Sequence, residues 1–313
     1  MSDHDFSGFS DFQEDNDWAG AKCQGFVENL PPPLSNLGRE YFRRQPWASH
    51  PSFVTAAPFW VGDVYHLPRD ACRSVVLPAC LAWVCVRLQD QMMDESENQW
   101  IKLSPLNPIL FMEMTRQYRA LFPVSSSFWN YLEQYLIEWT QSISWEQTDH
   151  WNKLHDYSED DLLLIAHKAA MFKLSAIPVA LLAGHQEAVE PLTQFVDYTL
   201  VAFDLVDQLR DWREDLQNKH YGYLLTKAIL GARWSDPTPP SEDFVQRVFL
   251  FTDVLDSVMS IAAKYSRLAR DCAVHLKGQY LIDYADTFAQ HCELILSQIA
   301  KDREQAFKNI VEA

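Results

Sequence analysis

Two groups of acidic residues are spaced so that each would lie on one face of a helix. The first is Asp90 and Asp94, and the second comprises Asp204, Asp207, Asp211 and Asp215, with Glu214 at its edge. At about 100° per residue, the second group spans roughly 80° of arc. Like charges one turn apart destabilise a helix, so a counter-charge is expected. Mg²⁺ prefers oxygen ligands and completes its shell with water and phosphate. The spacing therefore predicts several Mg²⁺ ions and a diphosphate held between two facing helices.

The residues around each group indicate that both helices are partly buried. A strongly apolar stretch, 81–86, precedes Asp90, and Phe203, Leu205 and Val206 flank the second group. A carboxylate in apolar surroundings needs a partner or a metal. The alternative is a solvated acidic face, which fits the Asp90/Asp94 pair better than the second group. Bound cations would favour the charged forms of these coupled carboxylates.

The composition favours a helical protein to position these groups. The 313 residues include 18 Phe, 12 Tyr and 11 Trp but only nine Gly, and 48% of the chain is hydrophobic. Long apolar-periodic stretches with few glycines indicate helices. We expect them at about 69–95 (kinked at Pro78), 107–122, 126–143, 159–183, 187–218, 242–275 and 277–310. The acidic segment 1–20 is predicted to be disordered, and residues 30–313 to form one domain.

Charge and cysteine usage limit the partners and the compartment. A net charge of −17 argues against a nucleic-acid partner. The six cysteines form no CxxC pair and no zinc spacing, which suits a reducing cytosol. No signal-peptide pattern opens the sequence, and the longest strongly apolar stretch, 75–86, is too short for a transmembrane segment. The prediction is a cytoplasmic protein without a transmembrane segment.

The two acidic segments resemble those of the class I isoprenoid synthase superfamily. The stretch 82–95, AWVCVRLQDQMMDE, looks like the first DxxxD segment of squalene and phytoene synthases, and 209–215, LRDWRED, looks like their second. Ser52-Phe53 and Leu67-Pro68-Arg69 resemble their upstream segment more loosely. Two departures weaken this branch of the resemblance. The glycine-rich helix between the motifs is replaced, and the basic RGRxYL segment survives only as 219–224, KHYGYL.

Other segments are similar to trans-polyprenyl synthases. The stretch 168–172, KAAMF, looks like their KT(A/G)xLF helix, and 181–184, LLAG, resembles the segment after that helix. The stretch 203–208, FDLVDQ, resembles their FQxxDD segment, with Asp204 for Gln and Gln208 for the second Asp. Asp207, Asp211 and Asp215 also mimic the spacing of the metal triad of terpene cyclases. The mixture resembles a terpene cyclase that diverged from the prenyl-synthase side.

The resemblance implies an all-α, single-domain helical bundle of the class I isoprenoid (terpene) synthase type with a central apolar cavity. It also implies a Mg²⁺-dependent terpene synthase that ionises a linear all-trans isoprenyl diphosphate to an allylic carbocation and releases diphosphate. The metal ligands would be Asp90, Asp94, Asp207, Asp211 and Asp215. Candidates for diphosphate contact are Arg87, Lys168, Arg210 and Lys219, since Arg and Lys bind phosphate. A salt bridge to a nearby aspartate is the alternative for each, above all for Arg210.

The carbocation would need aromatic faces and a dry cavity. The candidate lining residues are Phe53, Phe59, Trp60, Trp83, Phe172, Phe203 and Tyr223. Ordinary core packing is the alternative for every one of them. The DxDD motif of protonation-initiated cyclases is absent from the sequence, so ionisation is expected to begin the reaction.

Three other functions stay open at this point. A squalene/phytoene-type prenyltransferase would join two isoprenyl diphosphates head to head. A chain-elongating enzyme would consume isopentenyl diphosphate, although the first motif is not DDxxD. A non-catalytic helical protein that binds isoprenoids or modulates a synthase is the third. A homodimer is expected from the family resemblance alone.

Overall fold

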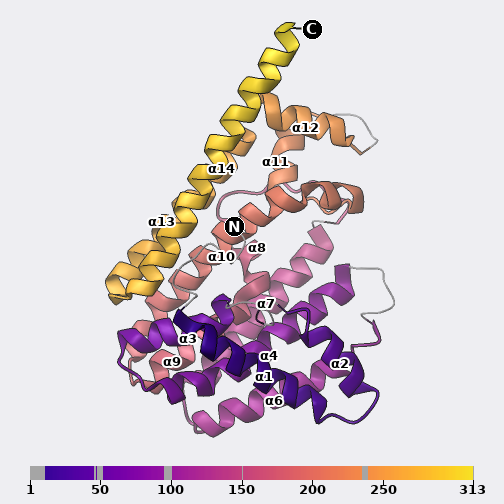
Figure 1. Cartoon of the computed structure of the whole chain (residues 1–313). Helices are drawn as coiled ribbons and strands as arrows, with labels where there is room; N and C mark the ends of the chain where they lie inside the picture. The colour runs from indigo at the N-terminus through magenta and orange to yellow at the C-terminus, as the bar shows by residue number, and fades with distance from the viewer. Residues whose placement is uncertain are drawn as a thin grey trace. The chain divides into compact units, whose positions relative to one another are not determined.

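The computed structural model describes residues 11–45, 47, 52–94, 101–149, 151–234 and 239–312. Within these ranges the regular elements are helices joined by short loops (Figure 1), and the β structure is limited to one isolated bridge between Trp151 and His220. The predicted all-α fold class is confirmed. By the packing of its backbone, the chain divides into two compact units.

The first unit comprises Met1–Leu136, Ala169–Thr193 and Cys272–Tyr284, and the second comprises Ile137–Lys168, Gln194–Asp271 and Ala285–Ala313. Several long helices contribute residues to both units, because their bounds cross these limits. One domain over residues 30–313 stays a prediction.

The first unit is organised around α4. Its other helices are α1 (Gln13–Glu28), α2 (Leu34–Phe42), α3 (Phe53–Val64), α6 (Leu106–Leu121), α9 (Ile177–Leu182) and the short 3₁₀ helix η5 (Gln186–Ala188). Helix α4 (Arg69–Asp94) packs against α1, α3, α6 and α9. Apolar residues at helical spacing, such as Leu81, Val84 and Leu88, are fully buried along it. Pro78 lies inside α4, which continues to Asp94 and so carries Asp90 on its last two turns.

The prediction of disorder through residue 20 is corrected from residue 13 onward, where α1 begins; residues 1–10 lie outside the described part. Asp15 and Asn16 of α1 are buried. Asp15 accepts hydrogen bonds from Arg69 and Arg73, and Asn16 donates to the Trp47 carbonyl and accepts from Thr55. These bonds compensate the cost of burying the polar groups of an acidic helix.

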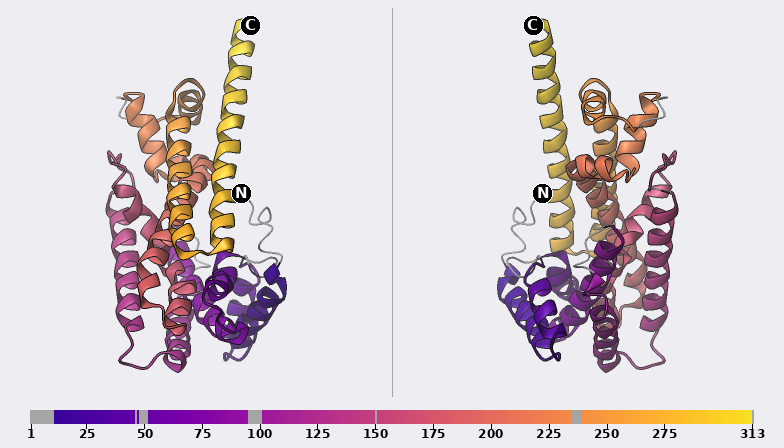
Figure 2. Two further views of the ribbon diagram at one scale, coloured as in Figure 1. Left: turned by 90° about the vertical axis from the view of Figure 1, so that its left-hand side faces the viewer. Right: turned by 90° about the vertical axis from the view of Figure 1, so that its right-hand side faces the viewer.

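The second unit contains α8 (Asp161–Ala166), α11 (Tyr223–Gly231), α12 (Glu242–Phe251) and most of α7 (Phe128–Asp149), α10 (Val189–Asn218), α13 (Val254–Leu276) and α14 (Gln279–Glu312). Helices α13 and α14 run antiparallel, side by side (Figures 1 and 2). The Arg270–Asp286 and Arg303–Asp256 ion pairs link them at both ends of this pairing.

Two helices expected from the sequence are interrupted. The predicted helix 242–275 is divided into α12 and α13, because Thr252 takes an extended conformation and its hydroxyl accepts from the Val254 amide. The predicted helix 159–183 becomes α8, the 3₁₀ helix η4 (His167–Ser175) and α9, with a non-helical backbone at Ala169. This irregular stretch carries Lys168.

Two helical stretches of the described chain are long and apolar enough to cross a membrane by composition alone. The most apolar 18-residue window has a mean hydropathy of 1.6 in Arg69–Met93 and of 1.5 in Asp161–Leu182. In each case 67% of the most apolar window is buried inside the protein, as in the core helix of a soluble protein. The absence of a transmembrane segment stays a prediction.

Candidate functional site

The second acidic group forms a stripe along α10, which we call the acid stripe: Asp204, Asp207, Asp211 and Asp215. Asp204 is buried, Asp207 and Asp215 are half-buried, and Asp211 is exposed. Buried Leu205, Trp212 and Leu216 occupy a different face of the same helix. The separation of apolar and acidic faces explains why α10 is helical here and why the carboxylates share one side.

Lys168 and Gln208 hold the buried end of the acid stripe. The Lys168 Nζ lies 2.8 Å from Asp204 Oδ1, and Gln208 Nε2 donates to Asp204 Oδ2 at 2.5 Å. The Gln208 Oε1 accepts from the Leu224 amide at 2.9 Å, at the beginning of α11. A Cβ on Gly222 would lie 2.9 Å from that oxygen, so the glycine permits the close approach. Asp204 is therefore compensated by the protein itself.

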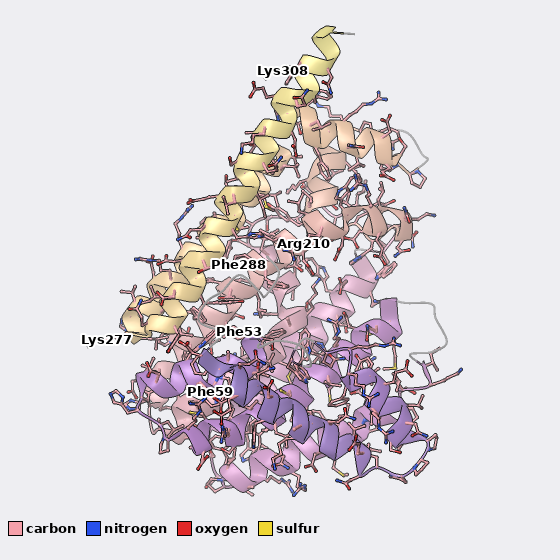
Figure 3. All side chains as sticks on the ribbon, viewed as in Figure 1. Phe53, Phe59, Arg210, Lys277, Phe288 and Lys308 are labelled. Atoms are coloured by element: carbon pink, nitrogen blue, oxygen red, sulfur yellow. The ribbon has the colours of Figure 1, made fainter. Side chains whose placement is uncertain are left out.

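Asp207 and Asp211 are the members of the acid stripe whose charged forms are disfavoured by their surroundings. Burial and the charge of Asp211 raise the pKa of Asp207 to about 6. Burial and the charge of Asp215 raise the pKa of Asp211. Arg210, labelled on α10 in Figure 3, lies 3.7 Å from Asp207. Its charge lowers the pKa of Asp211, but burial and Asp215 outweigh that effect. The structure therefore contains the salt bridge that was the alternative for Arg210, and the role of Arg210 at phosphate stays a prediction.

The donor set at Asp207 and Asp211 fits a hard cation. Carboxylates that raise one another's pKa values gain when a divalent ion binds between or beside them. Among the described residues, no group of three or more His, Cys, Asp or Glu side chains could hold an ion unaided. Mg²⁺ usually takes one or two carboxylates and completes its shell with water and phosphate oxygens. The stripe suits such an open site.

His220 is a site residue that the sequence patterns did not indicate. Its Nε2 lies 2.9 Å from Glu146 Oε1, and its Nδ1 lies 3.5 Å from Asp215 Oδ1. Burial alone would lower the pKa of His220, but the bonds to Asp215 and Glu146 outweigh it and raise the pKa to about 10. Glu146 belongs to α7, far from His220 in sequence, so no local spacing indicated this pair.

The other basic candidates near the stripe lie at its margin. Lys219 is exposed just beyond the last residue of α10, with a left-handed φ of 58°. Its carbonyl accepts from the Asn152 amide at 2.8 Å. Arg213 does not share the helix face of the acid stripe. It pairs with Glu242 at 2.7 Å and lies over the Trp212 ring, so its contacts lie outside the site.

The first acidic group belongs to the first unit. Asp90 is half-buried near the end of α4, and Asp94 is the last residue of that helix, with a side chain outside the described part. Arg87 is exposed and lies 5.7 Å from the Trp83 ring centroid. Tyr41 donates to Gln91 Oε1 at 2.7 Å and ties this turn to α2.

Four predicted aromatic residues come together in the first unit. The Phe53 ring lies 5.8 Å from Trp60 and 6.0 Å from Phe172, and Trp83 lies 4.6 Å from Phe172. Tyr284, which was not among the predicted lining residues, joins them at 5.7 Å from Phe53 and 5.2 Å from Trp60. The edge-on contacts at Trp60 and Trp83 are favourable for aromatic rings.

The three remaining aromatic candidates lie elsewhere. Phe59 stacks on Phe12 at 5.5 Å. Figure 3 labels Phe59 on α3 with Phe53, and labels Phe288 on α14, where it lies 6.1 Å from Phe203. Phe203 is 37% exposed, whereas Tyr223 is buried near Tyr157. The contacts of Phe59 and Tyr223 are those of ordinary core packing.

Comparison with known proteins gives a structural likeness without a sequence match. No protein-family model matches the chain, and no curated protein matches it. A decaprenyl diphosphate synthase from Rhodobacter capsulatus has a TM-score of 0.75 at 14% identity, covering 91% of this chain and 98% of that one. A geranylgeranyl pyrophosphate synthetase from Geoglobus acetivorans has a TM-score of 0.74 at 15% identity, covering 91% and 99%.

A third solved structure is a polyprenyl synthase from Caulobacter crescentus complexed with calcium and isoprenyl diphosphate. Its TM-score is 0.73 at 14% identity, and the match covers 91% of this chain and 97% of that chain. Identities this low establish a shared fold, and activity has to be argued from the site. The chain therefore has the all-helical fold of the class I isoprenoid synthase type.

Proposed function

We propose that this protein is an enzyme that ionises a linear isoprenyl diphosphate with the help of Mg²⁺. The observation that carries the proposal is the acid stripe on α10, in which Asp207 and Asp211 repel each other and gain from a bound cation. The fold type and the ligands named for the Caulobacter crescentus structure support the same substrate class.

In this proposal the acidic residues would bind the metal ions, and the basic residues would bind the diphosphate. Asp207 and Asp211 would hold the metal ions, with Asp90, Asp94 and Asp215 as further predicted ligands. Bound Mg²⁺ would neutralise the charge that develops on the leaving diphosphate as the allylic C–O bond breaks. Arg87, Lys168, Arg210 and Lys219 are the proposed contacts of the diphosphate oxygens, through charge-assisted hydrogen bonds.

The aromatic cluster of the first unit is the proposed lining for the carbocation. Phe53, Trp60, Trp83 and Phe172 present faces and edges within one cluster. An aromatic face stabilises a nearby cation by about 0.5–2 kcal/mol without reacting with it. Exclusion of water would protect the carbocation until it loses a proton or reacts. The central apolar cavity remains a prediction.

For the fate of the carbocation we propose cyclisation or elimination to a terpene, which makes the enzyme a lyase. The support is the departure of the α10 segment from the FQxxDD pattern, since Asp204 and Gln208 are engaged with Lys168 and Leu224. Prenyl transfer is the second candidate, because the compared structures with the same fold are named as prenyl diphosphate synthases. A cytoplasmic location and a homodimer remain predictions.

The deciding experiment combines a substrate panel with carboxylate variants. Farnesyl, geranylgeranyl and longer diphosphates are incubated with Mg²⁺, with and without isopentenyl diphosphate. Diphosphate release is measured, and products are identified by gas chromatography with mass detection. A terpene with the carbon count of its substrate supports the lyase. A longer diphosphate, or a hydrocarbon of twice the carbon count, replaces it with chain elongation or head-to-head transfer.

The variants test the metal site directly. Asp211→Asn is expected to lower diphosphate release by at least about 100-fold, since a ligand is lost. Glu214→Gln is the matched control, because it removes one exposed carboxylate from the edge of the same helix face. Unchanged release in both Asp211→Asn and Asp90→Asn would make the metal mechanism wrong.

A further inference from the structure

His220 lies between two carboxylates that belong to different helices. Glu146 comes from α7 and Asp215 from α10, and the imidazole nitrogens lie 2.9 Å and 3.5 Å from them. The side chains of Glu146 and His220 are 8% and 17% exposed, so the ion pair is largely removed from water. A buried carboxylate such as Glu146 requires a charged or hydrogen-bonding partner. His220 meets that need and also reaches the acid stripe.

The backbone fixes the imidazole in this place. The His220 amide donates to the Asp215 carbonyl at 2.8 Å, which closes the C-terminal end of α10. Trp151 pairs with His220 in the isolated antiparallel bridge, and its ring stacks on the imidazole at 5.0 Å. The left-handed turn at Lys219 makes this bridge possible. His220 is thus held by main-chain bonds, one of them to Asp215, and by stacking, independently of the carboxylate side chains.

The contact distinguishes Asp215 from the next acid of the stripe. Asp215 is half-buried and has one oxygen 3.5 Å from the imidazole Nδ1, whereas Asp211 is exposed. Metal-binding carboxylates are commonly oriented by a hydrogen bond from a second protein group, and loss of such a group weakens metal binding about 10–100-fold. Glu146 forms an ion pair with the other nitrogen of the imidazole, at 2.9 Å.

We propose that Glu146 and His220 are positioning residues that hold Asp215, and with it the C-terminal end of the acid stripe, in the conformation that binds metal and diphosphate. The inference rests on the proposed function, which supplies the metal. Glu146 and His220 would act through Asp215, without contacting the diphosphate and without taking part in the ionisation of the substrate.

The test uses Mn²⁺ with inorganic diphosphate as the probe, in the full-length protein. The concentration of free Mn²⁺ is measured by electron paramagnetic resonance during the titration. In activity assays, the Mg²⁺ concentration that gives half-maximal activity is determined separately from the maximal turnover rate. His220→Phe keeps a ring against Trp151 but removes both donors. Because it removes the imidazole partner of Glu146, the double variant His220→Phe/Glu146→Gln is the informative one. It is expected to keep the wild-type melting temperature within a few degrees and to bind Mn²⁺ about 10–100-fold more weakly.

Two further variants separate positioning from general structure. His220→Arg retains a two-donor cation and is expected to recover much of the Mn²⁺ affinity. His185→Phe is the matched control, because His185 also pairs with an acid, Glu187, and stacks on an aromatic ring, Tyr65, in the first unit. It is expected to bind Mn²⁺ as the wild type does. If the wild type binds Mn²⁺ and the double variant binds it equally well, the positioning pair is wrong. If the wild type binds none, the proposed function fails with it.

Discussion

Lys168 Nζ lies 2.8 Å from Asp204 Oδ1, so a lysine that the family resemblance assigns to diphosphate is ion-paired with the first acid of the stripe. The two residues come from η4 and α10. The Asp204 side chain is 8% exposed and that of Lys168 is 35% exposed. The pair therefore serves the stability of the second unit, whatever else Lys168 binds.

Removing Lys168 is expected to destabilise the protein by leaving Asp204 buried without its cation. Because Lys168 is partly exposed, we expect Lys168→Met to lower the free energy of unfolding by about 1–3 kcal/mol, less than for a fully buried pair. Lys168→Met/Asp204→Asn is expected to recover most of it. Urea denaturation gives the coupling energy. Lys227→Met is the control, since its partner Asp156 is 82% exposed; an equal loss there would refute the role of burial.

Asp207 is expected to make the metal-free protein less stable as the pH rises. Its pKa is about 6 in the folded protein against 3.8 for the ordinary side chain, so the folded state binds more protons between these values. Stability is lost through that window and stays lower above it. The Asp207 side chain is 48% exposed, so we expect at most about 1 kcal/mol.

The measurement compares Asp207→Asn with the wild type in thermal melts with chelator at pH 5 and pH 7.5. The variant is expected to be the more stable of the two at pH 7.5, to keep only part of this advantage at pH 5, and to lose it when Mg²⁺ and diphosphate are added. A wild type that gains stability over the variant as the pH rises would contradict the direction of the pKa shift.

Two aromatic candidates are expected to differ sharply in their contribution to folding. Trp60 is fully buried, whereas Phe203 is 37% exposed. Trp60→Ala is expected to lower the free energy of unfolding by about 3–5 kcal/mol through the cavity that it leaves. Phe203→Ala is expected to cost less than about 1 kcal/mol. Urea denaturation checks both values, and similar losses would show that Phe203 is packed in the core.

The first helix is expected to depend on a single carboxylate. Asp15 is fully buried and accepts from Arg69 and Arg73, so Asp15→Asn weakens two charged bonds at once. We expect a loss of about 3 kcal/mol. Asp17→Asn, two residues away on an exposed position, is the control and is expected to change little. Thermal melts compare them, and equal melting temperatures would mean that α1 is not anchored through Asp15.

Local periodicity predicted the elements whose faces differ in chemistry. Helix α10 was predicted within two residues at its N-terminus and to its last residue, because apolar and acidic positions separate at helical spacing. Helix α1 was missed, because its acidic composition hides the partners of Asp15, which lie 54 and 58 residues away. The interruption at Thr252 was missed, because neither Pro nor Gly marks it.

The residues of the candidate site, like the helices, were predictable only where they follow from a local sequence pattern. The acid stripe and Lys168 follow from one helix and one short motif, and the structure brings them together. The Glu146–His220 pair depends on how α7 meets the end of α10, and Tyr284 joins the aromatic cluster from α14. Contacts between elements distant in sequence leave no spacing to detect.

The two-sided bonding of Gln208 restricts what evolution or design can place there. Its side-chain amide donates a hydrogen bond to Asp204 and accepts one from the Leu224 main-chain amide. A carboxylate could do only the second, and it would repel Asp204 while doing so. An aspartate at position 208, as in the FQxxDD pattern, would therefore require another hydrogen-bond donor for Asp204. The two hydrogen bonds of Gln208 fix the position of the beginning of α11 against α10. The absence of a side chain at Gly222 leaves the space that the Gln208 side chain occupies.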